Sequence, residues 1–90
     1  MGVTIHIPIT HRHFTNGEKS VETSGGTVGE ALQHLISTFP AMEKELFTGT
    51  GEFRSTMEIY INRQSAYPNE LDKEVTTGDT IQIAAILSGG

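Results

Sequence analysis

Length, composition and charge limit what this protein can be. Its 90 residues carry six Lys and Arg against eleven Asp and Glu, for a net charge of −5, and they include no cysteine. A chain of this length forms one domain with a modest core. The lack of cysteine excludes disulfides, a thiolate nucleophile and a cysteine zinc site.

The charge pattern argues against nucleic-acid and membrane partners. Nucleic-acid binding requires clustered Lys and Arg, whereas the six basic residues are scattered along this sequence. No apolar run reaches the length of a membrane span, and the N-terminus lacks the regions of a signal peptide. We therefore expect a cytoplasmic protein that binds neither nucleic acid nor membrane. Its acidic surface favours a partner with a basic docking face.

Two segments near the N-terminus predict a hairpin. Residues 3–9 alternate apolar and polar side chains, which is typical of a half-buried strand. Pro8 cannot donate to a ladder, so the strand ends near it or lies at an edge there. A polar connection over residues 11–17 closes with an Asn-Gly turn dipeptide. Residues 18–23 then predict a weaker return strand.

The next segment predicts the main helix. Thr27 and Glu30 have the spacing of a capping box, in which the hydroxyl and the carboxylate each accept from an otherwise unpaired backbone N–H. Pro40 ends this helix. Apolar residues at helical spacing form one stripe, which must cover a sheet: Val28, Leu32, Leu35, Ile36 and Phe39.

The second half of the sequence predicts two more strands. Residues 41–47 predict one or two further helical turns, residues 48–52 a loop, and residues 63–72 an irregular connection. The alternation of residues 57–62 predicts a strand that leaves Tyr60 on the outer face.

Thr77-Gly78-Asp79 predicts a tight turn into the last strand, residues 80–85. Ile81, Ile83 and Ala85 share one face of it, whereas Gln82, Ala84 and Ile86 share the other. The order strand, strand, helix, short helix, strand, strand predicts a two-layer α+β domain over residues 1–90.

The end of the sequence is its most unusual feature. The last strand leads directly into Ile86-Leu87-Ser88-Gly89-Gly90. A glycine carboxylate has no β-carbon beside it, so it can enter a narrow catalytic channel. Residues 87–90 reach roughly 13 Å when extended, enough to enter a partner's active site. The alternative is an ordinary frayed terminus.

These features resemble the ubiquitin-like, β-grasp sulfur carriers, namely the molybdopterin synthase small subunit, the thiamine-pathway carrier and the cysteine-pathway carrier. The resemblance covers the whole chain, and its specific element is the closing diglycine. In family members, proline or a similar residue often precedes the diglycine, whereas this chain differs from that pattern at residues 85–87. The segment from Pro40 to Thr56, with Arg54 before a strand, is most similar to the cysteine-pathway carrier. The matching segments are Thr27 to Leu32, Glu58 to Asn62, Gly78 to Ile81 and Gly89-Gly90.

The resemblance implies a β-grasp fold. Such a fold has a mixed sheet of four to five strands, with the first and last strands parallel at its centre and one main helix on one face. Residues 87–90 would then be a flexible diglycine tail.

The resemblance also implies a carrier and not an enzyme. An adenylating partner, similar to ubiquitin-activating enzymes, would use ATP to activate the Gly90 carboxylate. Sulfur would displace AMP, and a sulfur-accepting biosynthetic enzyme would use the resulting thiocarboxylate. The chain has no Walker-type loop and no cysteine nucleophile, so we expect no bound cofactor; ATP and the sulfur source belong to the partner. Cysteine or a related sulfur amino acid is the expected product, with molybdopterin and thiamine as alternatives.

Six residues are expected to bind the partner. Leu87 and Ser88 would lie in its groove, and Gly89 would keep the tail slim next to the reacting Gly90. Exposed apolar clusters usually mark interaction sites, so the outward-facing side chains of the last two strands would form a docking patch. Its members are Tyr60, Ala84 and Ile86, although Tyr60 is equally well explained as an ordinary surface tyrosine.

Two other functions are compatible with these sequence features. A ubiquitin-like modifier that forms an isopeptide bond through Gly90 needs the same diglycine and the same kind of partner, so the sequence does not separate the two. A β-grasp interaction module would need neither glycine. No metal site is expected, because no Cys and no nearby Asp completes a ligand set around the four histidines, His6, His11, His13 and His34.

Overall fold

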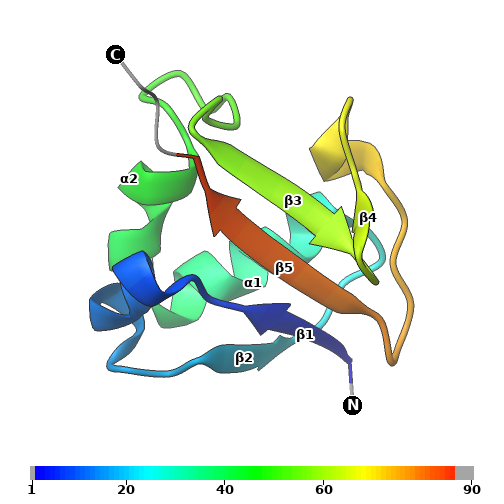
Figure 1. Ribbon diagram of the computed structural model, residues 1–90, viewed down its shortest axis with the longest axis horizontal. Helices are drawn as coiled ribbons and strands as arrows, with labels where there is room; N and C mark the ends of the chain where they lie inside the picture. Colours follow the sequence, from blue (N-terminus) through cyan, green and yellow to red (C-terminus); the bar gives the residue numbers. More distant parts are fainter. Residues whose placement is uncertain (1, 87–90) are drawn as a thin grey trace.

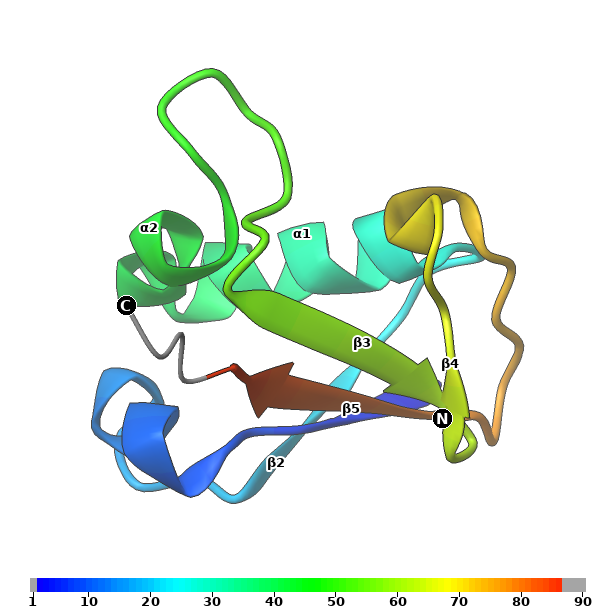
Figure 2. The ribbon, with the colours of Figure 1, turned by 45° about the horizontal axis from the view of Figure 1, so that its top comes forward.

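A five-stranded mixed sheet carries helix α1 across one face, as Figures 1 and 2 show. The computed structural model describes residues 2–86, so the predicted tail at residues 87–90 lies outside the described residues. The strands are β1 (Val3–His6), β2 (Ser20–Thr23), β3 (Met57–Ile61), β4 (Gln64–Ser65) and β5 (Thr80–Ala85). The helices are α1 (Val28–Thr38), α2 (Glu43–Leu46) and the short 3₁₀ helices η1 (Ile9–Thr15), η2 (Pro40–Met42) and η3 (Glu70–Asp72). The predicted α+β class is confirmed.

Strand β5 lies in the middle of the sheet, whose order is β2-β1-β5-β3-β4. It pairs in parallel with β1, with Ile5 opposite Ile81, and antiparallel with β3, with Ile59 opposite Ile83. The parallel pairing of the first and last strands is therefore confirmed. The first half of β5 has a neighbour on each side, but β1 pairs with it only as far as Gln82, so the end of β5 is held by the hydrogen bonds to β3.

Helix α1 follows its prediction closely. The Thr27 Oγ1 accepts a hydrogen bond from the Glu30 N–H at 3.1 Å. The Glu30 carboxylate accepts from the Gly26 N–H at 2.6 Å, one residue before the position that a capping box uses. The predicted stripe lies against the sheet, with Phe39 half-buried at its end and Val28, Leu32, Leu35 and Ile36 buried.

The N-terminal segment differs from its prediction. The strand does end near Pro8, since β1 stops at His6, but the apolar alternation that continues to Ile9 does not mark a strand, because residues 9–15 form η1. Pro8 begins this helical turn: its C=O accepts from the His11 N–H at 2.9 Å. The side chain of Ile9 is consequently 77% exposed, although it continues the apolar alternation.

The connection after β3 also differs from its prediction. The residue types predict an irregular segment, but β4 pairs antiparallel with β3, with Ile61 opposite Gln64. Asn62 and Arg63 lie between them with φ of 48° and 76°, the conformation of a two-residue hairpin turn. Arginine rarely adopts positive φ, so the residue types concealed this turn.

The turn into β5 is confirmed. Gly78 has a φ of 97°, which glycine adopts without strain. The Asp79 carboxylate accepts from Asn62 Nδ2 at 3.0 Å and from the Thr76 N–H at 2.8 Å. These hydrogen bonds hold the pKa of Asp79 below its ordinary value and join this turn to the β3–β4 hairpin. None of the helices within residues 2–86 has the length and apolar character needed to cross a membrane.

Candidate partner-binding site at the end of strand β5

The described chain leaves the sheet at Ile86. Its N–H donates to the Thr56 C=O at 2.8 Å, which extends the pairing with β3 by one residue. Its side chain is 41% exposed. The end of β5 lies near α2 and the loop that follows α2, as both ribbon views show (Figures 1 and 2). The residues before the predicted tail are thus held firmly at the surface.

Two surface hollows flank the end of β5. On the side of η1, Arg12 and residues 6–9 line a hollow together with residues 82–85. On the side of α2, Lys44, Glu45 and Arg54 line a second hollow together with Ala85 and Ile86. A partner that binds the chain at the end of β5 would contact the walls of both hollows.

Basic side chains gather around this point. Arg12, Lys44 and Arg54 line the two hollows, and they are half of the six Lys and Arg in a chain of net charge −5. Arg12 Nε donates to the Ile7 C=O at 3.1 Å, and Arg54 Nε donates to the Lys44 C=O at 2.6 Å. The basic residues are scattered along the sequence, but the fold collects three of them. No spacing in the sequence indicates this.

The histidines serve local contacts. His11 Nε2 lies 2.9 Å from Glu45 Oε1 and joins η1 to α2. Both His11 and His13 lie on η1, and the His13 ring packs against Phe14 with centroids 4.0 Å apart. His34 Nδ1 accepts from the Ser24 N–H at 2.8 Å. Within residues 2–86 no three His, Cys, Asp or Glu side chains are grouped to hold a metal ion.

The structure alters the predicted docking patch. Tyr60, Ala84 and Ile86 do lie on one face of the sheet, and Leu87, Ser88, Gly89 and Gly90 lie outside the described residues. However, the register places Tyr60 opposite Gln82 and Glu58 opposite Ala84. Glu58 therefore separates Tyr60 from Ile86, and the Tyr60 hydroxyl donates to its carboxylate at 3.0 Å. The surface is a mixed polar and apolar patch, because strand pairing across β3 and β5 inserts a carboxylate.

The Tyr60–Glu58 hydrogen bond gives a pH-dependent prediction. The bond to Glu58, together with the negative charge of that carboxylate, raises the pKa of Tyr60 above its ordinary value. The associated stability is complete below the ordinary pKa of tyrosine and is lost as the pH rises through the folded value. In the variant Tyr67→Phe, which leaves Tyr60 as the only tyrosine, ultraviolet titration should give a raised pKa. Adding Glu58→Gln should lower the pKa of Tyr60 again. An equal pKa with and without Glu58→Gln would contradict the hydrogen bond.

Comparison with known proteins identifies the family. The ThiS family matches residues 5–90, nearly the whole chain. The chain belongs to the ThiS family of ubiquitin-like sulfur carriers. Among curated relatives of this ThiS-family member, the sulfur carrier protein CysO of Mycobacterium tuberculosis is 29% identical over 93 residues, covering all of both chains.

Solved structures share the fold of this ThiS-family domain. A chain of the Amycolatopsis orientalis BexX/CysO complex has a TM-score of 0.88 and 32% identity, over 99% of this chain and 100% of that one. Mycobacterium tuberculosis CysO, described as an antigen, has a TM-score of 0.86 and 27% identity, over 96% and 100% of the two chains. The fold of SAMP1 from Haloferax volcanii is also similar, with a TM-score of 0.85. The predicted β-grasp fold and family are confirmed, and the resemblance to the cysteine-pathway carrier agrees with the CysO relatives.

Proposed function

We propose that this protein is a sulfur carrier that delivers sulfur as a thiocarboxylate on Gly90. The observation that carries the proposal is the extent of the match. The ThiS family matches through residue 90, and the sulfur carrier protein CysO aligns over the whole of both chains. The closing Gly89-Gly90 therefore belongs to the region that is similar to known sulfur carriers.

The chemistry begins with a carboxylate, which is a poor electrophile. An oxygen of the Gly90 carboxylate attacks the α-phosphorus of ATP in the adenylating partner, forming an acyl adenylate and releasing pyrophosphate. Hydrosulfide or a protein persulfide then supplies sulfur to the carbonyl carbon, and AMP leaves. With hydrosulfide the products are the thiocarboxylate, AMP and a proton; a persulfide additionally needs a thiol to reduce the resulting disulfide.

The fold suits a protein whose C-terminal segment is the substrate of a partner enzyme. Strand β5 pairs with β1 as far as Gln82 and with β3 as far as Ala85, and the Ile86 N–H continues the pairing on the β3 side. The reacting segment is therefore anchored to the sheet through β3. Four further residues reach roughly 13 Å, which carries the carboxylate beyond the domain's own surface. The catalytic groups must then come from the partner, in keeping with a carrier and not an enzyme.

The proposed acceptor is an enzyme that makes cysteine or a related sulfur amino acid. This choice rests on the similarity to the sulfur carrier protein CysO, which covers the whole of both chains. Molybdopterin and thiamine synthesis, and conjugation of Gly90 to lysines of other proteins, are the alternatives. Each would leave a different product in the cell.

The intact mass of protein purified from its native cells tests the proposal. Under conditions that preserve thiocarboxylates, a species with one oxygen replaced by sulfur is expected. Incubation with ATP, sulfide and a cell extract should increase that species. Lysine-linked adducts that end in Gly89-Gly90 would favour a modifier, and neither product after such incubation would contradict both activities.

The docking patch can be tested separately from the chemistry. Tyr60→Lys should weaken binding to the adenylating enzyme by roughly tenfold, since it removes an aromatic contact worth more than about 1 kcal/mol. Calorimetry or surface plasmon resonance measures this change. Gln33→Lys adds the same charge on the exposed side of α1 and should leave binding unchanged. Equal binding by both variants and the unaltered protein would remove Tyr60 from the interface.

A further inference from the structure

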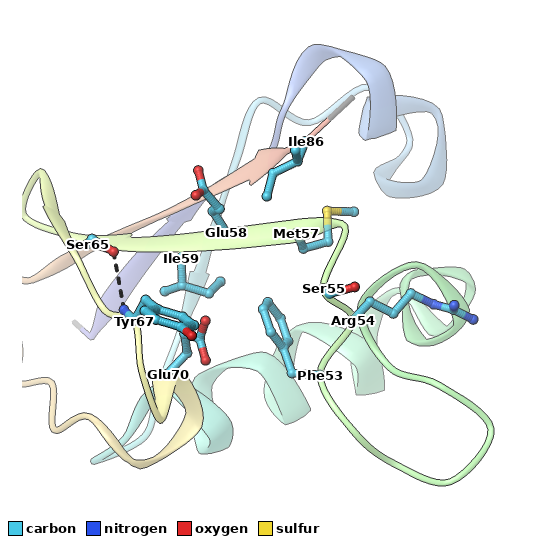
Figure 3. Close-up of a pocket in the computed structure, with 10 residues that line it drawn as sticks. All are labelled: Phe53, Arg54, Ser55, Met57, Glu58, Ile59, Ser65, Tyr67, Glu70 and Ile86. Carbon is cyan, nitrogen blue, oxygen red and sulfur yellow. Dashed lines mark hydrogen bonds between the residues drawn. The ribbon is translucent and has the colours of Figure 1, made fainter. Parts of the chain in front are cut away.

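A hollow lies at the edge of β3, on the side away from β5. It has a volume of about 300 Å³. Figure 3 shows Tyr67 and Glu70 on one side of it and Phe53 on the other, with Ile59 pointing into it from β3. Glu58 and Ile86 border the hollow from the outer face of the sheet.

The hollow exists because β4 is short. It covers β3 only at Tyr60 and Ile61, so the first half of β3 has no neighbouring strand on that side. The chain beyond β4 crosses this side instead, where the Ala66 N–H donates to the Ile59 C=O at 2.9 Å. The loop before β3 forms the other wall.

The walls are apolar and unusually exposed. The Tyr67 side chain is 77% exposed, and within residues 2–86 two of the three exposed large apolar side chains, Tyr67 and Ile86, border this one hollow. Phe53 is half-buried and held edge-on against Phe47, with ring centroids 6.1 Å apart. Clustered exposure of this kind marks interaction sites, and tyrosine is enriched among residues that dominate binding.

The charge inside the hollow is negative. The Glu70 carboxylate forms no hydrogen bond and no ion pair with any residue from 2 to 86. Arg54 points away from the hollow in Figure 3, because its Nε is bonded to the Lys44 C=O. The nearby Lys73 ammonium is bonded to the Pro68 C=O at 2.7 Å. A cationic ligand is therefore favoured, as it is for the whole chain at net charge −5.

We propose that this hollow binds an arginine side chain of a partner protein. The apolar stem of arginine would lie between Phe53 and Tyr67 over Ile59. Its planar guanidinium would stack on the Tyr67 ring and donate to the Glu70 carboxylate. Arginine suits this site better than lysine, because a guanidinium combines stacking with paired hydrogen bonds. A purely apolar side chain would leave the Glu70 carboxylate beside it without a partner.

The proposed contact does not involve the Gly90 carboxylate, so the test needs no activating enzyme. The full chain, labelled with ¹⁵N, is titrated with an acetylated and amidated Gly-Arg-Gly peptide and, in parallel, with the same peptide carrying neutral citrulline. The arginine peptide should give saturable shifts at Phe53, Ile59, Tyr67 and Glu70. The citrulline peptide should bind at least about fivefold more weakly, because it loses the charge-assisted hydrogen bonds.

Variants decide whether the contact is specific. Glu70→Gln and Tyr67→Ala should each weaken arginine binding by at least about threefold. Glu18→Gln removes the same charge near the opposite edge of the sheet and should have no such effect. Absent shifts, shifts centred elsewhere, equal binding of citrulline, or equal effects of Glu18→Gln and Glu70→Gln would each overturn the proposal. A chain that lacks Gly89 and Gly90 should bind the peptide normally, so failure of the carrier function would not affect this result.

Discussion

Deleting Gly89 and Gly90 is expected to abolish thiocarboxylate formation while the melting temperature of the domain stays the same. The deletion removes the proposed reacting carboxylate. It leaves untouched the sheet, the core and every hydrogen bond that holds residues 2–86. Mass spectrometry after incubation with ATP, sulfide and the activating enzyme measures the first effect, and thermal unfolding measures the second.

A subtler variant tests the shape of the terminal residue. Gly90→Ala keeps the carboxylate but adds a β-carbon next to it, so it should slow adenylation by roughly a hundredfold if the partner's channel is narrow. Gly49→Ala is the matched control, because a β-carbon there would meet no atom within 4 Å. Normal thiocarboxylate formation by the truncated chain would contradict the proposed function.

Leu32→Ala is expected to lower the free energy of unfolding by about 2–5 kcal/mol. Leu32 is fully buried between α1 and the sheet, so truncation removes apolar burial and leaves a cavity. Since the free energy of unfolding of such a domain is roughly 5–15 kcal/mol, this loss is a large share of its stability. Urea denaturation measures the loss. An unchanged m-value would indicate that the variant exposes the same surface on unfolding.

The neighbouring residue provides a control for this core variant. Gln33 is exposed on the same helix, so Gln33→Ala should change the unfolding free energy by no more than about 0.5 kcal/mol. A loss below about 1 kcal/mol for Leu32→Ala would show that the helix does not pack as described. Folded Leu32→Ala protein should still accept sulfur, which distinguishes a stability defect from loss of the reacting group.

The strongest local signals in the sequence determined the main elements. The hydroxyl of Thr27, the apolar stripe that includes Leu32 and the stop at Pro40 predicted α1 closely. The alternation of β3 and β5 predicted which residues face the core. Such features depend on capping, periodicity and backbone restriction, which act over a few residues and can be read in order along the chain.

Local patterns misled where a neighbouring part of the chain decided the outcome. Apolar alternation continued to Ile9, but the backbone turned at Pro8 into η1. Strand β4 was missed because its turn places Arg63 at positive φ, a conformation that its own side chain does not favour. Pairing with β3 compensates for that preference in the folded chain.

Tertiary structure decided how the residues of the candidate sites are arranged. The diglycine and the side chains proposed to contact a partner can be read from the sequence. The placement of Glu58 within the docking patch, the gathering of Arg12, Lys44 and Arg54 at the end of β5, and the hollow beside Tyr67 cannot. Each depends on strand register and on contacts between loops that are far apart in the sequence. Those contacts form only when the other strands have paired with one another and with β5.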